Sequence, residues 1–222
     1  MEKLKKINDD GWITSVIICV IGILITFIFG KINWYSLFGL TLGIIYEHVV
    51  EWFAHGWFQH YQNKIFKFFY WRHQRHHDDS SSHHALQPIS ILIPVIIVIL
   101  FPFILIVGFF KNTLLVGFAT GSIIGFLFAH IYLNLLHFDI HSKKKIFPAF
   151  FRKTSYFQKI YTEHINHHIE HKTGIIKSRY RVYSISNPWL DILLDKLGIN
   201  AKVDKLYPLF IKFIEDKIYH GR

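Results

Sequence analysis

Four apolar runs are the first feature of the hydrophobic pattern. They cover residues 13–29, 34–46, 89–110 and 114–136. A helix needs about 20 apolar residues to cross the hydrocarbon core of a bilayer, at about 1.5 Å per residue. The second run is only about two-thirds of that length, so we expect its helix to extend outward beyond Tyr46. The pattern predicts an all-α protein with four transmembrane helices.

The two remaining stretches, residues 47–87 and 137–222, are polar and contain no complete apolar span. The connections at residues 30–33 and 111–113 are short. With four spans, these short connections place the N-terminus and both polar stretches on the same side of the membrane. The sequence therefore predicts one domain over residues 1–222, an integral membrane four-helix bundle with a histidine-rich helical cap.

Composition supports a membrane protein. Hydrophobic residues make up 51% of the 222 residues and charged residues only 18%, a balance that a soluble chain of this size would struggle to bury. The formal net charge of +10 comes from 25 basic residues, of which 23 fall on the side of the cap. An excess of Lys and Arg is typical of cytosolic loops, so we expect the cap to be cytosolic and the charge to reflect topology rather than nucleic-acid binding. A bacterial inner membrane and an endoplasmic reticulum fit this topology equally well.

The cap contains four short histidine boxes. Two have the pattern H-x2-HH, which places three imidazoles at i, i+3 and i+4, on one face of a helix, where they can converge on a metal ion. Another pair is spaced i, i+4, and the remaining pair is five residues apart, about 140° around an ideal helix. That last pair serves different ions or lies on a distorted turn. The boxes are His55 and His60; His73, His76 and His77; His137 and His141; and His164, His167 and His168.

Ten box histidines are too many for one ion. A single ion rarely uses more than six ligands, so the count predicts two metal ions sharing a site. Cys19 is the only cysteine, which excludes an internal disulfide and makes thiolate ligation improbable. We expect the six other histidines to be buried, to support the ligands or to lie on the surface: His48, His83, His84, His130, His171 and His220.

Several acidic residues near the boxes are candidates for orienting imidazole N–H groups, the usual role of a carboxylate behind a metal ligand. Tyr132 is a further candidate for a hydrogen bond at the site, although a tyrosine at the membrane interface is the more frequent situation. The acidic candidates are Glu51, Asp78, Asp139, Glu163 and Glu170.

The order and spacing of the four boxes, together with four spans, resemble the fatty acid hydroxylase and sterol desaturase superfamily of membrane di-metal oxygenases. The resemblance covers residues 47 to about 198, and the intervals are most similar to those of fatty acid 2-hydroxylases. The segment 183–198 also resembles the short helix that follows the last box in that family, starting near Asn187-Pro188 and ending at Gly198. Carotenoid hydroxylases share the first box in a Glu-Trp context, but their third box is typically H-x4-H.

The resemblance implies O2-dependent hydroxylation of a C–H bond in a membrane lipid, most closely a fatty acyl chain, with the ten box histidines as metal ligands. Iron is expected in turnover, and zinc is possible in the purified protein. Eukaryotic members of the 2-hydroxylase type carry an N-terminal cytochrome b5 domain. Here the first span begins near residue 12, so we expect a separate electron donor, cytochrome b5-like or ferredoxin-like with its reductase. A sterol, carotenoid or alkylglycerol oxidase of the same superfamily is the alternative.

Two readings from other classes stay open. A membrane metal-binding or transport protein would need polar groups along a transmembrane path, yet 13–29 and 89–107 contain no ionisable residue apart from the weakly acidic Cys19. A non-catalytic homologue is the other reading, and ten intact box histidines disfavour it.

Overall fold

The computed structural model describes residues 11–78, 113–173 and 185–220, and every regular element within these ranges is a helix. The all-α class predicted from the sequence is confirmed for this part of the chain. The chain divides into two compact units: Met1–Val50 with Ser81–Ile146, and Glu51–Ser80 with Phe147–Arg222. The single domain predicted for residues 1–222 stays a prediction.

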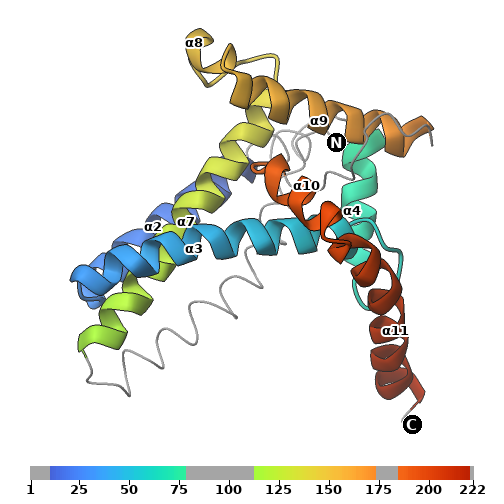
Figure 1. The fold of residues 1–222 in the computed structure, drawn as a ribbon, viewed down its shortest axis with the longest axis horizontal. Helices are drawn as coiled ribbons and strands as arrows, with labels where there is room; N and C mark the ends of the chain where they lie inside the picture. Colours follow the sequence, from blue (N-terminus) through green and yellow to red (C-terminus); the bar gives the residue numbers. More distant parts are fainter. Residues whose placement is uncertain (1–10, 79–112, 174–184, 221–222) are drawn as a thin grey trace, which may run out of the picture. The chain divides into compact units, whose positions relative to one another are not determined.

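The first unit is built on the packing of α2 (Gly11–Phe29) against α7 (Thr113–His141), which lie side by side (Figure 1). An apolar cluster lies between these two helices. Its buried members are Cys19, Ala119, Ile123, Phe126 and Leu127. Two largely apolar helices need only shape complementarity to pack, and no polar group is required in this core.

Helix α3 (Trp34–Phe53) crosses α7 at a line of glycines. A Cβ added to Gly121 would lie 1.9 Å from the carbonyl oxygen of Ser36, and one added to Gly43 would lie 2.0 Å from that of Ser122. Any side chain at these positions would therefore collide with backbone. Small residues four apart allow this close approach, which is typical of helix pairs in membranes.

The turn between α2 and α3 is fixed by side-chain hydrogen bonds. The Asn33 side chain accepts a hydrogen bond from the backbone N–H of Tyr35 and donates one to the carbonyl oxygen of Thr113. The backbone N–H of Lys31 donates to Thr120 Oγ1. These bonds tie the start of α3 to the start of α7.

Two of the four predicted spans coincide, in the described part of the chain, with helices long and apolar enough to cross a membrane: Trp34–Phe58 and Thr113–His141. The helix expected to extend beyond Tyr46 continues through α3 to Phe53 and then into a π-helix. The predicted span 13–29 coincides with α2, whose described apolar part, Ser15–Phe29, is shorter than either of these two helices. The predicted span 89–110 lies outside the described residues. The four-helix bundle, the multi-pass topology and the cytosolic side stay predictions.

The second unit contains the end of α3 and six further elements, which are all helical over its described residues. They are the π-helix η1 (Ala54–Phe58), α4 (Lys67–Asp78), α8 (Ala149–Arg152), α9 (Ser155–Thr173), α10 (Pro188–Lys196) and α11 (Ile199–His220). Helix α9 contacts both α4 and α10. It therefore connects the two sequence segments of the unit, Glu51–Ser80 and Phe147–Arg222.

Aromatic side chains with polar edges form the core of the second unit. Trp52 and Trp57 are buried, with ring centroids 4.8 Å apart in an edge-on arrangement. Their indole N–H groups donate to α11, Trp52 Nε1 to Asn200 Oδ1 at 3.1 Å and Trp57 Nε1 to Asp204 Oδ1 at 3.2 Å. Buried indoles need such partners, so these bonds fix α11 against the helix end that carries the first histidine box.

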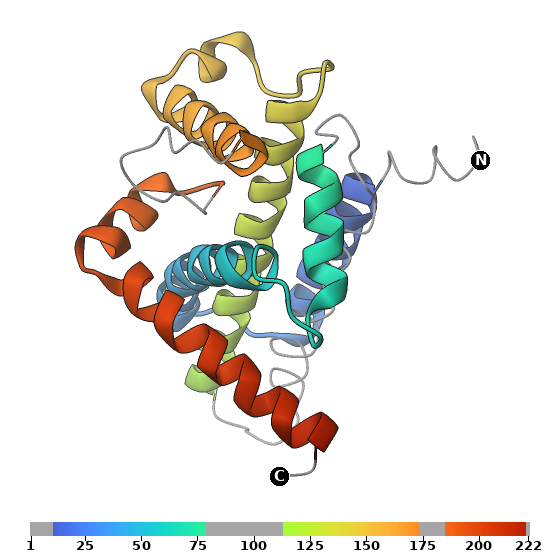
Figure 2. The same ribbon diagram turned by 90° about the vertical axis from the view of Figure 1, so that its right-hand side faces the viewer.

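The short helix expected between Asn187 and Gly198 is α10, and α11 follows it after a sharp turn (Figure 2). Asn187 is the N-cap, with its side chain accepting from the backbone N–H of Leu190, and Pro188 occupies the first helical position. Gly198 follows with φ of 69°, the left-handed conformation that glycine adopts at little cost after a helix.

Candidate metal centre

The first histidine box lies on a distorted helix. Residues 54–58 form a π-helix, and the backbone N–H of Gln59 donates to the carbonyl oxygen of Ala54, five residues back. A π-turn is wider than an α-turn, so residues five apart come onto one side. The ring centroids of His55 and His60 are accordingly 5.1 Å apart. Of the two alternatives from the sequence, the distorted turn is the one observed.

The two H-x2-HH boxes lie on α4 and α9, and each of them divides between two groups of rings. On α4, His73 and His77 join one group, while His76 faces the other. On α9 the division is reversed, with His167 in the first group and His164 and His168 in the second. Residues i and i+4 lie about 40° apart around the helix, and the residue at i+3 is turned about 60° from the first and about 100° from the second. The three histidines of each box are therefore divided between two neighbouring candidate metal positions.

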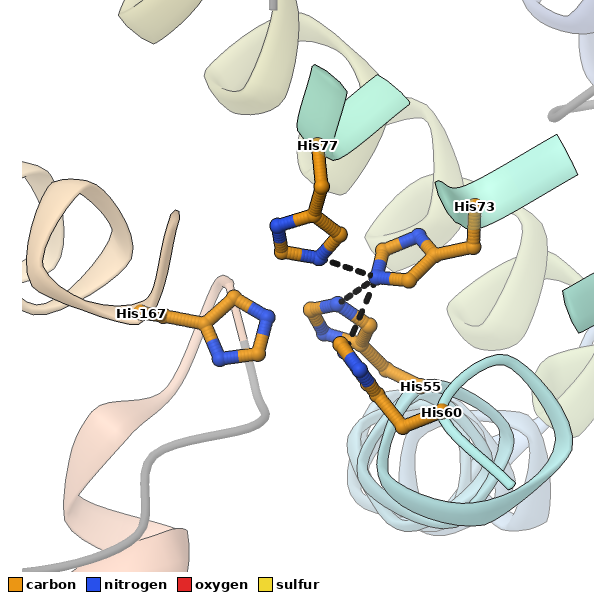
Figure 3. Close-up of side chains that lie close together, drawn as sticks. All are labelled: His55, His60, His73, His77 and His167. Carbon is orange, nitrogen blue, oxygen red and sulfur yellow. Dashed lines mark hydrogen bonds between the residues drawn. The ribbon is translucent and has the colours of Figure 1, made fainter. Parts of the chain in front are cut away.

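The first group lies entirely within the second unit and contains His55, His60, His73, His77 and His167, which offer one ring nitrogen each within 4.8 Å of all the others. Figure 3 shows the five rings turned toward one another from three parts of the chain. His55, His73 and His77 are buried, and the other two are half-buried. These five imidazoles could hold a metal ion.

His73 is at the centre of the first group. Its Nε2 lies 3.0 Å from Nε2 of His55, 2.9 Å from that of His60 and 2.8 Å from that of His77. One ring nitrogen has either one N–H or one lone pair, so the three contacts cannot all be hydrogen bonds. Four ring nitrogens therefore crowd one small volume, an arrangement that a cation would stabilise.

The second group contains three histidines of the same unit. His164 and His168 are one turn apart on α9, with 3.1 Å between their Nε2 atoms. The ring centroid of His76 is 4.7 Å from that of His168. All three side chains are buried. They form a second set of converging nitrogen donors, which could also hold an ion.

Burial and neighbouring imidazoles lower the pKa of His73. The pKa of His73 lies well below 6.5, first because the ring is buried, and then because of the nearby rings of His60, His55, His77 and His76. A metal ligand must be an unprotonated imidazole, so the environment holds His73 in the form that binds metal at neutral pH.

The third box, His137 and His141, belongs to the first unit. The two residues are one turn apart near the end of α7, with ring centroids 4.8 Å apart. This spacing allows both rings to bind one ion. Their participation in the two-metal centre stays a prediction, as does the assignment of all ten box histidines as ligands.

Among the carboxylates expected to support the site, Glu51 is held most firmly. It is buried one helical turn before His55 and accepts hydrogen bonds from the backbone N–H groups of Ile185 and Ser186 and from the Ser186 hydroxyl. The Glu51 carboxylate thus anchors the segment before α10 to the helix end that carries the first box.

Other carboxylates have different partners. Glu163 pairs with Lys159 on the same helix at 2.5 Å. The Asp139 side chain accepts from the backbone N–H of Ile146 and thereby closes the turn after α7. An imidazole partner for either carboxylate stays a prediction, as do the roles suggested for Asp78, Glu170 and Tyr132.

One buried polar pair was not anticipated. Glu47 on α3 and His130 on α7 are each 1% exposed, and Oε1 of the carboxylate lies 3.1 Å from Nδ1 of the ring. Both residues interrupt apolar stretches, and an ionisable residue in an apolar span usually has a partner. That signal was present in the sequence, but it does not say which residue on another helix is the partner.

Comparison of the chain with models of protein families, with curated proteins and with solved structures gives no match.

Proposed function

We propose that this protein is a membrane-bound di-metal oxygenase that uses iron in turnover to hydroxylate a C–H bond of a membrane lipid, in a fatty acyl chain. The observation that carries the proposal is the convergence of five imidazoles from η1 and the turn after it, α4 and α9 on one point, with a second set of three beside it on α4 and α9. The resemblance of the box spacing to membrane hydroxylases supplies the reaction class.

The number of donors in the first group favours an ion of higher coordination number. Ligand nitrogens at about 2.1 Å from an ion are about 3.0 Å apart when adjacent in a five- or six-coordinate site, and about 3.4 Å apart in a tetrahedral one. The three nitrogen pairs around His73 measure 2.8–3.0 Å. Five donors around one point suit a higher coordination number than structural zinc usually has, and imidazole ligands suit iron.

Bound iron would supply the change of oxidation state that O2-dependent hydroxylation needs and that zinc lacks. The reaction balances as one C–H bond, one O2, two electrons and two protons giving one C–OH bond and one water. The electrons must come from a separate donor, for which a cytochrome b5-like or ferredoxin-like protein with its reductase is proposed.

The chain's own residues fix the ligand positions. The π-helix places His55 and His60 on one side, and α4 places His73 opposite them. Glu51 ties the start of this arrangement to the backbone before α10. Rings held this firmly lose little freedom when metal binds, which raises the affinity of the site.

A membrane lipid fits the apolar character of the chain. Two helices are long and apolar enough to cross a membrane, and their outward side chains include Phe38 and Phe128, each 61% exposed, and Trp34, which is 84% exposed. An acyl chain can stay in an apolar environment while its reacting carbon reaches a polar site at the membrane edge. We propose this arrangement for the substrate.

Metal analysis combined with an activity assay tests the proposal. Protein loaded with ferrous iron under argon, then given a reductant, O2 and extracted membrane lipids, should add one oxygen to an acyl chain, detected by mass spectrometry with 18O2. His73→Ala and His167→Ala should lose bound metal and activity together, whereas Gln74→Ala on the same helix should keep both. Retention of both metals in either histidine variant would overturn the ligand assignment.

The third box has its own test. If His137 and His141 complete the second group, the double variant His137→Ala, His141→Ala should bind one ion instead of two and should lose hydroxylation. Two retained ions with normal activity would remove these residues from the centre while leaving the first group unaffected.

A transport function makes the opposite prediction. Proteoliposomes would then show selective metal flux that His76→Ala abolishes, with no consumption of O2 on lipid. Under the proposed function, no flux above that of empty liposomes is expected.

A further inference from the structure

Helix α11 has two different faces. On its inner face, Tyr207 and Ile211 are buried in the aromatic core of the second unit. The opposite side carries four large apolar side chains, each of them more than half exposed: Leu206, Leu209, Phe210 and Phe213. These four residues, which we call the outer stripe, are spaced three, four and seven apart and therefore form one continuous strip along the helix.

A stripe of this kind needs a partner. Single exposed apolar residues are common, but a contiguous apolar strip on a rigid helix usually marks a surface that another molecule or a membrane covers. Since the inner face already packs α11 onto its own unit, the outer stripe is not required for the fold of that unit.

The charges of α11 are separated in the same way. Asp204 is turned inward, where it accepts the indole hydrogen bond of Trp57, and Glu215 accepts from the backbone N–H of Lys64. The four lysines, in contrast, are all exposed: Lys202, Lys205, Lys212 and Lys217. Asp216, half-buried on the flank of the stripe, is the remaining carboxylate of the helix. The outer side is therefore apolar along its centre and basic around it.

We propose that α11 docks on an anionic lipid surface, with the outer stripe inserted at the boundary between headgroups and acyl chains and the lysines at the level of the phosphates. Long lysine stems can lie along apolar surface while the ammonium reaches the headgroups. Lys217 already lies against the stripe, with Nζ 5.9 Å from the centre of the Phe213 ring. Helices that lie in a membrane interface combine these same features.

A lipid surface fits better than a protein partner. Lys202 and Lys217 stand at the two ends of the stripe, about 22 Å apart at the rise of an α-helix. An apolar strip framed by four lysines and one flanking carboxylate, Asp216, matches a fluid anionic surface, which can supply a phosphate wherever a lysine lies. This proposal concerns a different surface from the metal centre and does not depend on the chemistry there.

Depth-dependent quenching on the full-length protein in lipid nanodiscs tests the docking. In a Cys19→Ala background, a fluorophore is attached to Phe213→Cys or to Lys212→Cys, adjacent positions that point about 100° apart. In discs with anionic lipid, the probe at 213 should be quenched several-fold more by nitroxide-labelled lipids, and less by aqueous iodide, than the probe at 212. The pair Leu206→Cys and Ala201→Cys repeats the comparison nearer the start of α11. An unchanged helical circular dichroism spectrum shows that each variant folds.

Removal of charge tests the role of the lysines. Each of Lys202→Gln, Lys205→Gln and Lys212→Gln should shift the equilibrium between docked and undocked α11 by about fivefold. Replacement of part of the anionic lipid by zwitterionic lipid should weaken docking in proportion to the amount replaced. Equal lipid quenching at 212 and 213 would overturn the proposal. Protection of the probe at 213 from both quenchers, seen only in discs that hold two copies of the protein, would also overturn the proposal. In that case a second copy would cover the stripe.

Discussion

The helices in the two units of this chain are held together by different kinds of interaction. In the first, α3 meets α7 through glycines and α2 meets α7 through an apolar core, so backbone and hydrocarbon surfaces fit directly. In the second, the helices are joined by indole hydrogen bonds and by converging imidazoles. The core between α2 and α7 is apolar, whereas the second unit brings together imidazole nitrogens whose short contacts cannot all be hydrogen bonds.

This difference indicates where metal should matter for stability. Metal binding contributes to folding wherever the ligands converge only in the folded state. The first histidine group draws on three segments that are far apart in the sequence, so it meets that condition. The core of α2 and α7 contains no such group, and its stability should be independent of metal.

Removal of metal should have the largest effect. Stripping metal with a chelator should lower the protection of backbone amides in η1, α4 and α9 by about 4 kcal/mol or more, the contribution of a ligand present at about a thousand times its Kd. Amides in α2 and α7 before residue 137 should keep their protection. Hydrogen exchange followed by mass spectrometry measures both regions in one sample, and equal loss in both would contradict the comparison.

A change in the first unit should have the converse effect. Gly121→Leu places a side chain where a Cβ alone would lie 1.9 Å from a backbone oxygen, so α3 and α7 must separate. We expect a loss of roughly 3 kcal/mol or more, at the upper end of the cost of overpacking. Metal bound by the first histidine group should remain. Gly198→Ala, at an open position with φ of 69°, is the matched control and should cost only about 1 kcal/mol, for its backbone conformation.

Acid should destabilise the second unit selectively. Because the pKa of His73 in the folded protein lies well below 6.5, the unfolded chain takes up this proton first as the pH falls. Stability is therefore fully present above pH 6.5 and is lost below it, by at most about 1.4 kcal/mol per pH unit for each such histidine. Metal-free protein titrated from pH 7.5 to 5 should lose protection in α4 before α2, and an unchanged order of protection would argue against a buried neutral His73.

The indole hydrogen bonds should have the smallest effect. Trp57→Phe keeps most of the ring but leaves the Asp204 carboxylate without the indole donor, which should cost about 1–3 kcal/mol. The loss should appear as faster exchange in α11. The double variant Trp57→Phe, Asp204→Leu should recover part of the stability because no half-buried carboxylate then lacks its indole partner. An additive loss would show that the bond contributes little.

Much of this architecture could be predicted from the pattern of the sequence. The positions of α2, α3 and α7 follow from apolar runs, and the boxes follow from histidine spacing. The division of each H-x2-HH triplet between two groups could not be predicted, because i, i+3 and i+4 share a face closely enough that only the neighbouring helices decide which ring turns where.

The π-helix and the buried Glu47–His130 pair could not be predicted from the sequence, for a related reason. A five-residue interval is compatible with a distorted turn or with two separate ligands, and only tertiary packing selects between them. A carboxylate and an imidazole on two apolar helices each require a partner, but the pairing depends on how α3 crosses α7 at its glycines.

The central claim is that converging imidazoles hold two redox-active ions, and the most direct test is iron content with X-ray absorption spectroscopy on the protein loaded anaerobically in nanodiscs. The account predicts two irons per chain with five or more nitrogen neighbours at about 2.1–2.2 Å, beyond the four of a tetrahedral site, and one iron fewer in His73→Ala. A chain that binds no iron, or that holds one tetrahedral ion unaffected by His73→Ala, would contradict it.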